Sequence, residues 1–239
     1  MTSILFLGFL IGLRHALEAD HVAAVASLVT KTNSVNQAIK QGAVWGLGHT
    51  ITLFLFGSAV ILMDSVMPET MARTLEFCVG IMLVVLGIDV LRRIMRDKIH
   101  FHHHKHQDGK EHVHAHSHRG ETTHSEASHD HEHTKGFPMR ALLVGLMHGM
   151  AGSAALILLT LQTVTSPLTG MIYMALFGLG SIIGMAMLSV VISIPLRYSE
   201  NGLTWLYNGL HVTIGIMTVL IGAALSYESG ISFIDGGLI

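Results

Sequence analysis

Six long apolar segments are the feature that most constrains the fold of this chain. Each has about 20 or more mostly apolar residues, the length of helix that crosses a bilayer core of about 30 Å. Outside the stretch from Arg96 to Gly136, the other 198 residues carry only 17 charged side chains, far fewer than the roughly one quarter typical of a soluble domain. The sequence therefore predicts an all-α integral membrane protein with six transmembrane helices. The six segments are Ile4–Val29, Ala38–Met63, Thr74–Met95, Met139–Val164, Leu168–Pro195 and Thr204–Ser226.

The composition excludes several classes of protein. Cys78 is the single cysteine, so a disulfide scaffold is excluded. The formal net charge is −2 and no basic stripe is present, so nucleic acid is not an expected partner. No phosphate-binding loop of the GxxxxGK type occurs, which argues against ATP hydrolysis. A di-iron membrane enzyme is disfavoured because the intramembrane histidines are mostly one per segment. We expect no enzyme activity and no prosthetic group.

Lysine and arginine residues in the short loops predict the orientation of the segments. Most of them gather on one side, whereas the other side has Arg73 and the acidic residues Glu228 and Asp235. This pattern predicts a multi-pass protein of the cytoplasmic membrane with both termini outside. The connection between the third and fourth segments then lies in the cytoplasm. The basic residues on that side are Lys31, Lys40, Arg92, Arg93, Arg96, Lys98, Arg140 and Arg197.

The two halves of the chain resemble each other at a nearly constant offset. Matching stretches begin at Gly12 and Gly145, at Trp45 and Phe177, and at Gly80 and Gly215, with offsets of 133, 132 and 135 residues. Each half has three segments, so the second copy would enter the membrane in the opposite sense, as in transporters with inverted repeats. We predict a first three-helix repeat over residues 1–95, a histidine-rich segment over 96–136 and a second three-helix repeat over 137–239.

Ionisable side chains interrupt the first apolar segment. Five polar residues fall within eight positions, from Arg14 to His21. A charged group costs at least about 2.5–3.5 kcal/mol at the centre of a bilayer, unless it is paired or holds a cation. Imidazole together with carboxylate suits divalent first-row transition metals, whereas oxygen alone would favour magnesium or calcium. Later segments add further histidines. We predict a midplane metal site formed by His15, Glu18, Asp20, His21, His49 and His148.

The spacing leaves two arrangements open for the first segment. On a continuous helix at about 100° per residue, His15, Glu18 and His21 share a face and Asp20 points away. If the helix is unwound here, as at some transporter sites, all four can converge. An alternative for Arg14 is a buried ion pair with one of these carboxylates that merely fixes packing. His211 lies on the last segment. Considered by itself, it is more typical of a hydrogen-bonded core histidine than of a metal ligand.

Two motifs resemble those of a known family. Arg14-His15-Ala16-Leu17-Glu18-Ala19-Asp20-His21-Val22 resembles the RHA(V/F)DADHI signature of the nickel/cobalt transporter (NiCoT) family. Leu47-Gly48-His49-Thr50 resembles that family's second motif, LGH(S/T). The resemblance covers about the first 65 residues. It implies that His15, Asp20, His21 and His49 select and carry Ni²⁺ or Co²⁺.

The sequence also departs from that family in three respects. Glu18 stands at the family's first acidic position and is one methylene longer. The family's later LGFDT(A/T)TE motif is missing, and the stretch from Gly145 to Met150 stands in its place. Six apolar segments are present where the typical member has eight. This pattern is similar to the smaller urease-accessory (UreH-like) nickel permeases allied to the family.

The segment from Arg96 to Gly136 contains 13 of the 18 histidines. Many alternate with other residues, as from His112 to His118. Histidine-rich tracts bind divalent transition metals through neutral imidazole. The shortage of apolar residues predicts that this segment is disordered without metal. We expect a cytoplasmic metal buffer here, and the alternative is a solvated linker.

These patterns together predict a secondary transporter of Ni²⁺ or Co²⁺. Uptake is favoured, because a dication gains about 4.6 kcal/mol on crossing a 100 mV potential that is negative inside. One alternative is an efflux permease with the same site. Another is a membrane-anchored metal-storage or chaperone protein, in which the histidine-rich segment suffices. The expected partners are the transported ion, the lipid bilayer and a cytoplasmic metallochaperone.

Overall fold

The computed structural model describes residues 2–63, 68–96, 100–105, 111–116, 137–151, 166–200 and 204–235. Within these ranges the chain is helical apart from short connections and one pair of strands. The helices are α1 (Thr2–His15), α2 (Ala19–Val29), α3 (Val35–Met63), α4 (Glu69–Arg96), α5 (Met139–Ala151), α7 (Pro167–Glu200) and α8 (Thr204–Asp235). The strands are β1 (His100–Lys105) and β2 (Glu111–His116).

Within the described ranges, four helices are long and apolar enough to cross a membrane: α3, α4, α7 and α8. They coincide with the second, third, fifth and sixth apolar segments of the sequence. The first segment is not one continuous helix, because α1 ends at His15 and α2 begins at Ala19. The fourth segment begins as α5, and its continuation over residues 152–165 lies outside the described residues. These features are those of a multi-pass, all-α membrane protein.

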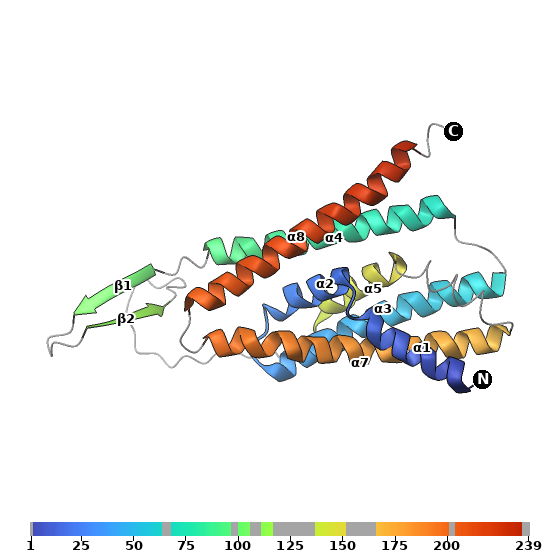
Figure 1. Ribbon diagram of the computed structural model, residues 1–239, viewed down its shortest axis with the longest axis horizontal. Helices are drawn as coiled ribbons and strands as arrows, with labels where there is room; N and C mark the ends of the chain where they lie inside the picture. Colours follow the sequence, from blue (N-terminus) through green and yellow to red (C-terminus); the bar gives the residue numbers. More distant parts are fainter. Residues whose placement is uncertain are drawn as a thin grey trace.

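The helices pack as one elongated bundle (Figure 1). α4 packs along α8, and α3 packs along α7. α1 contacts α7, α5 contacts α3, and α2 lies among α3, α4, α7 and α8. The core includes Trp45, Leu83, Phe177 and Met185, each no more than 1% exposed. The short helix α2 is therefore surrounded by longer helices, whereas α5 packs against α3 and α4 and leaves one side exposed.

Two glycines let α5 approach α3 at backbone distance. A Cβ atom added to Gly145 would collide with the carbonyl oxygen of Trp45, and one added to Gly149 with that of His49. Small residues that allow such close approach are typical of helix contacts in membranes. This contact places the histidine of α5 beside the histidine of α3.

The histidine-rich segment contains an antiparallel pair of strands, which differs from the disorder expected there. The register pairs His100 with His116, His102 with His114, and His104 with His112. The alternating sequence is compatible with this, because residues two apart share one face of a strand. The structure therefore describes strands at β1 and β2, and disorder without metal stays a prediction for this segment. Residues 97–99, 106–110 and 117–136 lie outside the described part of the chain.

The two ends of the bundle differ. α4 and α7 end, and α3 and α8 begin, at the end from which the hairpin projects, and both chain termini lie at the other end (Figure 1). At the hairpin end, Asp89 Oδ2 lies 2.9 Å from Lys31 Nζ and 2.8 Å from Arg140 Nη2. Arg93 Nη2 lies 3.8 Å from the same oxygen. These groups are partly exposed, so the ion pairs contribute little stability, but they connect three parts of the bundle.

Candidate metal centre

The break between α1 and α2 carries most of the predicted ligands. α1 ends where the Leu17 N–H bonds to the carbonyl of Arg14 at 2.9 Å and the Glu18 N–H to that of His15 at 3.0 Å. Glu18 has extended backbone, with ψ of 148°, and α2 begins after it. Asp20 lies in the first turn of α2, where the helix dipole favours a negative charge. Of the two arrangements left open by the sequence, the unwound one is observed.

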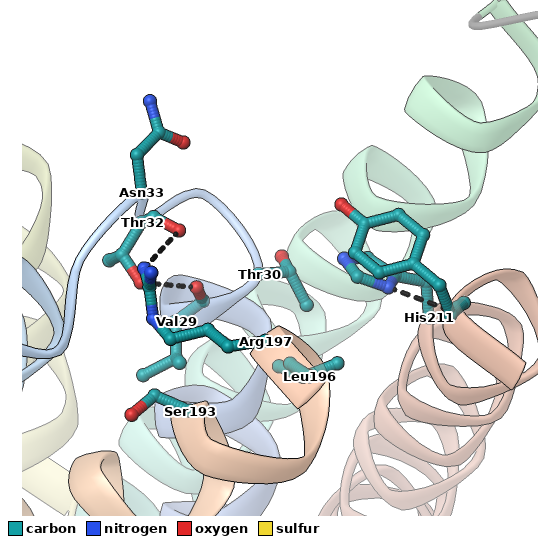
Figure 2. A pocket seen from close by; sticks show the side chains of 9 residues that line it. Val29, Thr30, Thr32, Asn33, Ser193, Leu196, Arg197 and His211 are labelled. Carbon is teal, nitrogen blue, oxygen red and sulfur yellow. Dashed lines mark hydrogen bonds between the residues drawn. The ribbon is translucent and has the colours of Figure 1, made fainter. Parts of the chain in front are cut away.

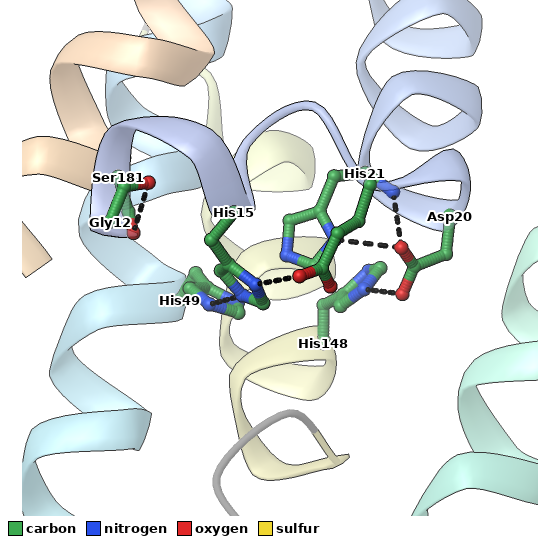
Figure 3. A network of polar contacts seen from close by, with 8 residues as sticks. Gly12, His15, Asp20, His21, His49, His148 and Ser181 are labelled. Atoms are coloured by element: carbon green, nitrogen blue, oxygen red, sulfur yellow. Dashed lines mark hydrogen bonds and ion pairs between the residues drawn. The ribbon is translucent and has the colours of Figure 1, made fainter. Parts of the chain in front are cut away.

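Three histidines from α1, α2 and α3 converge at this break (Figure 3). His15 Nε2 and His49 Nε2 lie 3.3 Å apart. The ring centroid of His21 lies 4.2 Å from that of His15 and 5.1 Å from that of His49. One ligand atom of each histidine lies within 4.8 Å of the other two. His21 and His49 are at most 1% exposed, so this group of nitrogens could hold a metal ion away from bulk water.

A second group shares His21 and adds a residue from α5. His148 Nε2 lies 2.9 Å from Asp20 Oδ2, and His21 Nδ1 lies 2.8 Å from Asp20 Oδ1. The ring centroids of His21 and His148 are 4.3 Å apart. Asp20, His21 and His148 also bring one ligand atom each within 4.8 Å of one another. The two groups form one polar cluster with His21 at its centre.

Carboxylates fix the proton positions on three of these rings. An ionised carboxylate only accepts hydrogen bonds. His15 Nδ1 therefore donates to Glu18, at 2.9 Å. His21 Nδ1 and His148 Nε2 likewise donate to Asp20. The other nitrogen of each ring then carries a lone pair. Metal-binding histidines have this arrangement, with one ring N–H donated to a carboxylate and the other nitrogen left for the ion.

The lone-pair nitrogens are buried. In this cluster, His21 Nε2, His49 Nδ1 and His148 Nδ1 have no hydrogen-bond partner among the described residues. For His21 and His148 these are the atoms that the hydrogen bonds to Asp20 leave unprotonated. A buried polar atom without a partner costs about 1–3 kcal/mol. Unpaired nitrogens on buried rings that lie this close together suit a cation.

Two aromatic side chains form walls of the cluster, and the sequence did not identify them as part of the site. Trp45 is fully buried, and its ring centroid lies 5.4 Å from those of both His21 and His148. Phe177 is 1% exposed, and its ring centroid lies 5.2 Å from that of His15. The signal that could have found them is their match in the repeat. Apolar walls exclude water and strengthen electrostatic interactions inside the site.

Glu18 and Arg14 are placed differently from the buried ligands. The Glu18 side chain is 58% exposed while it bonds to His15. Arg14 is exposed. In the described part of the chain, Glu18 and Asp20 form their ion pairs with histidines and not with Arg14. The alternative of an Arg14 ion pair that fixes packing is therefore wrong.

His211 lies outside this cluster. It is 6% exposed on α8, and its Nδ1–H donates to the carbonyl oxygen of Tyr207 at 2.9 Å. It lines a separate pocket with Thr30 and Arg197, between the end of α2, α7 and α8 (Figure 2). The interpretation of His211 as a hydrogen-bonded interior histidine agrees with this position.

Comparisons with known proteins add the family. The family described as the cytochrome C biogenesis protein transmembrane region matches residues 3–224. The urease accessory protein UreH of Bacillus sp. (strain TB-90) is 34% identical over 233 residues, covering 97% of this chain and 94% of the relative. A protein of Methanocaldococcus jannaschii, named for a suggested nickel/cobalt efflux function, is 26% identical over 188 residues, covering 76% of this chain and 72% of the relative. No solved structure matches the chain.

These matches agree with the motifs around His15 and His49. The relatives are named for accessory or transport roles and the matching family is a transmembrane region, so the prediction that the chain is no enzyme is confirmed. The match to UreH extends the likeness from the first 65 residues to nearly the whole chain. The chain belongs to the family of the cytochrome C biogenesis protein transmembrane region and to the UreH-like nickel/cobalt permeases.

Proposed function

We propose that this chain is a secondary transporter that moves Ni²⁺ or Co²⁺ across the cytoplasmic membrane, with uptake as the favoured direction. The observation that carries the proposal is the convergence of four histidines with Asp20 at a break in an apolar helix. Ionisable groups inside a membrane are costly and mark ion pathways. Broken helices near the centre of a bundle are typical of transporter binding sites. The histidines are His15, His21, His49 and His148.

The ion would be held by imidazole nitrogen and carboxylate oxygen, as cargo and not as a prosthetic group. Glu18 is more than half exposed and bonded to His15, which suits a ligand at the entrance. His21 belongs to both candidate metal groups. An ion can therefore move from the group of His15 and His49 to the group of Asp20 and His148 by exchanging ligands one at a time. Transport requires such sites to bind well enough to admit the ion and weakly enough to release it.

Six spans in two inverted three-helix repeats fit the packing of the helices. The contact of α1 with α7 has its counterpart in the contact of α5 with α3. The pairs α3 with α7 and α4 with α8 each join equivalent helices of the two halves. A Cβ atom on Gly12 would collide with the carbonyl oxygen of Phe177, as one on Gly145 would with that of Trp45. These matched contacts support repeats over 1–95 and 137–239 with the cluster between them.

The membrane potential favours uptake as the direction of transport. Basic residues of the short loops favour a cytoplasmic location for the end of the bundle that carries the hairpin, with both termini outside. A dication that enters the cell down a potential of about 100 mV, negative inside, gains about 4.6 kcal/mol. Uptake through this site therefore needs no ATP.

Efflux is the second candidate, because a relative with 26% identity is named for a suggested nickel/cobalt efflux function. Efflux would use the same ligands but would work against the membrane potential. It would need a coupled ion, and exchange for protons at the histidine–carboxylate pairs would supply one. The direction of nickel movement in cells separates the two candidates.

The histidine-rich segment, residues 96–136, serves in this proposal as a cytoplasmic buffer. It receives ions after entry, and a cytoplasmic metallochaperone takes them from it. Thirteen histidines give it a capacity for several ions. The competing storage function predicts that this segment suffices and that the intramembrane histidines are dispensable.

The test is the accumulation of radiolabelled nickel and cobalt in cells that lack their own carriers. The variants are His15→Ala, His49→Ala and a deletion of residues 101–135. His124→Ala, which removes one histidine of the loop, is the matched control. Loss of a ligand is expected to reduce accumulation at least as strongly as loss of a ligand's hydrogen-bond partner, which costs roughly 10–100-fold.

Each outcome has one meaning. Accumulation that falls in both histidine variants but survives in the deletion and in His124→Ala supports an importer with this site. Wild-type accumulation below that of cells without the protein shows efflux. If only the deletion reduces accumulation, the loop is the functional part and the intramembrane site is wrong.

A further inference from the structure

Arg197 lacks a counter-ion in the part of the chain that the structure describes. Its Nη2 donates to the carbonyl oxygen of Thr32 at 3.2 Å. Its Nε is buried and has no hydrogen-bond partner among those residues. The ion pairs at this end of the bundle involve Asp89 and other cations. A partly buried guanidinium without an acceptor for one of its donors is costly, so this position favours a bound anion.

Among the described side chains, positive charge exceeds negative charge around Arg197. A single described carboxylate, Asp89, is shared by three cations. The most distant of these, Arg93, has its Nη2 3.8 Å from that carboxylate and donates to Thr30 Oγ1 at 3.3 Å. Arg93 and Arg197 therefore reach residues 30–32 from two different helices. The three cations are Lys31, Arg93 and Arg140.

A pocket lies beside Arg197 and residues 29–33 (Figure 2). It is lined by Thr30, Ser193 and Arg197, together with Tyr207 and His211 of α8. The flat guanidinium group of arginine can bind two oxygens of a phosphate or carboxylate at once. A small polar pocket with one such group suits a compact oxyanion.

Exposed aromatic side chains lie close to this pocket in the sequence. Tyr198 directly follows Arg197 and is 78% exposed, and Trp205 near the start of α8 is 72% exposed. Tyrosine and tryptophan are enriched where lipid headgroups meet acyl chains. Basic pockets between transmembrane helices at the cytoplasmic surface bind anionic headgroups.

We propose that the pocket between α2, α7 and α8 binds a phosphate group, with Arg197 as its principal ligand and Arg93 as the second cation. An anionic phospholipid headgroup and free inorganic phosphate offer the same chemistry. A bound phosphate would connect α7 and α8 to residues 30–32. Residues 30–32 lie about 16 Å along the direction of α2 from Asp20 and His21. A phosphate bound in the pocket would therefore fix the position of α2, which carries these two proposed metal ligands. The anion site does not depend on the direction or identity of the transported metal.

The test measures anion binding by the nickel-free full-length protein. One arm titrates inorganic phosphate against the protein in detergent, with chloride at equal ionic strength as the salt control. The other arm compares lipid retention by native mass spectrometry after exposure to phosphatidylglycerol or phosphatidylcholine. The variants are Arg197→Gln and Arg197→Lys. Arg92→Gln is the matched control, because Arg92 is exposed and lies on α4 next to Arg93.

Wild type and Arg92→Gln are expected to bind, and Arg197→Gln to bind roughly 10–100-fold more weakly, the range for a charged hydrogen bond of about 1.5–3 kcal/mol. Arg197→Lys keeps the charge but loses the two-point contact, so intermediate binding is expected. If Arg197→Gln does not fold, phosphate binding by Arg197→Lys is compared with binding by Arg92→Lys. Weaker binding by Arg197→Lys alone supports the proposal. Binding of phosphatidylglycerol alone identifies the lipid as the source, and binding of free phosphate identifies the soluble ion. The proposal is overturned if the wild-type protein binds neither phosphatidylglycerol nor free phosphate. It is also overturned if the Arg92 and Arg197 variants lose binding equally. The experiment does not measure nickel transport. If no anion binds, the anion site is wrong and the proposed transport function is unaffected.

Discussion

His148 donates a hydrogen bond from Nε2 to Asp20 Oδ2 at 2.9 Å, and this bond joins the second half of the chain to the break in the first. The other carboxylate oxygen accepts from the backbone N–H of His21 at 2.9 Å and from its Nδ1 at 2.8 Å. One carboxylate thus orients two imidazole rings, and the remaining ring nitrogens of both are buried without a described partner. Asp20 is therefore the residue that aligns the two candidate metal groups.

Replacing Asp20 with asparagine tests this alignment. The amide offers one accepting oxygen in place of two, so it cannot accept from both histidines with the same geometry. We expect nickel affinity to fall roughly 10–100-fold, the usual cost of losing a partner that orients a metal ligand. The measurement is calorimetric titration of nickel into protein that lacks residues 101–135. Glu69→Gln is the control, because the Glu69 side chain is 83% exposed at the start of α4, away from the candidate metal groups. Equal affinity in Asp20→Asn and wild type would contradict this role.

Replacing Gly149 with alanine tests the contact that brings His148 to His49. The added Cβ would collide with the carbonyl oxygen of His49, so α5 must move away from α3. We expect a loss of about 1–3 kcal/mol in stability, as for overpacked interiors, together with weaker nickel binding. Gly209→Ala is the control, because a Cβ there meets no atom within 4 Å.

The control should be neutral or slightly stabilising, since alanine is the better helix former by about 1 kcal/mol. Thermal unfolding of the nickel-free protein in detergent measures both variants. A Gly149→Ala protein that is as stable as wild type and binds nickel equally well would show that the close contact is not needed.

The resemblance motifs contain His15, Asp20, His21 and His49 of the candidate site. The break between α1 and α2 was harder to predict from the sequence. Residues 16–19 are Ala, Leu, Glu and Ala, all compatible with a helix and without glycine or proline. Propensity alone therefore predicts that the helix continues. The chain unwinds there in the structure because Glu18 and Asp20 bond to histidines from three helices, which is a tertiary effect. Helix propensity contains no signal for it, and the spacing of the polar residues left it only as one of two options.

The repeat had mixed value as a predictor. It matches His148 with His15 at the offset of 133 residues, and the structure brings His148 to Asp20. It also matched Trp45 with Phe177, but only the structure shows both rings beside the histidines. Histidine and carboxylate residues are recognisable in the sequence as candidate metal ligands. Trp45 and Phe177 are not, because aromatic residues in apolar segments are usually part of the core.

Deletion of residues 101–135 separates the proposed buffer from the proposed transport site. The deleted protein should bind fewer nickel ions per chain, because most of the 18 histidines lie in that segment. Its tightest site should keep its affinity, since the intramembrane ligands lie on α1, α2, α3 and α5. Equilibrium dialysis with metal analysis gives both the number of ions and the affinity. Loss of the tightest site in the deleted protein would show that the loop supplies it.

The most direct test of the central claim is the X-ray absorption spectrum of Ni²⁺ bound to the protein without residues 101–135. We predict at least two imidazole ligands, with metal–nitrogen distances of about 2.0–2.1 Å as for other divalent ions bound by histidine. His21→Ala should lose imidazole scattering, because His21 belongs to both candidate groups. A spectrum with oxygen ligands only, or one that His21→Ala leaves unchanged, would contradict a metal site at the break between α1 and α2.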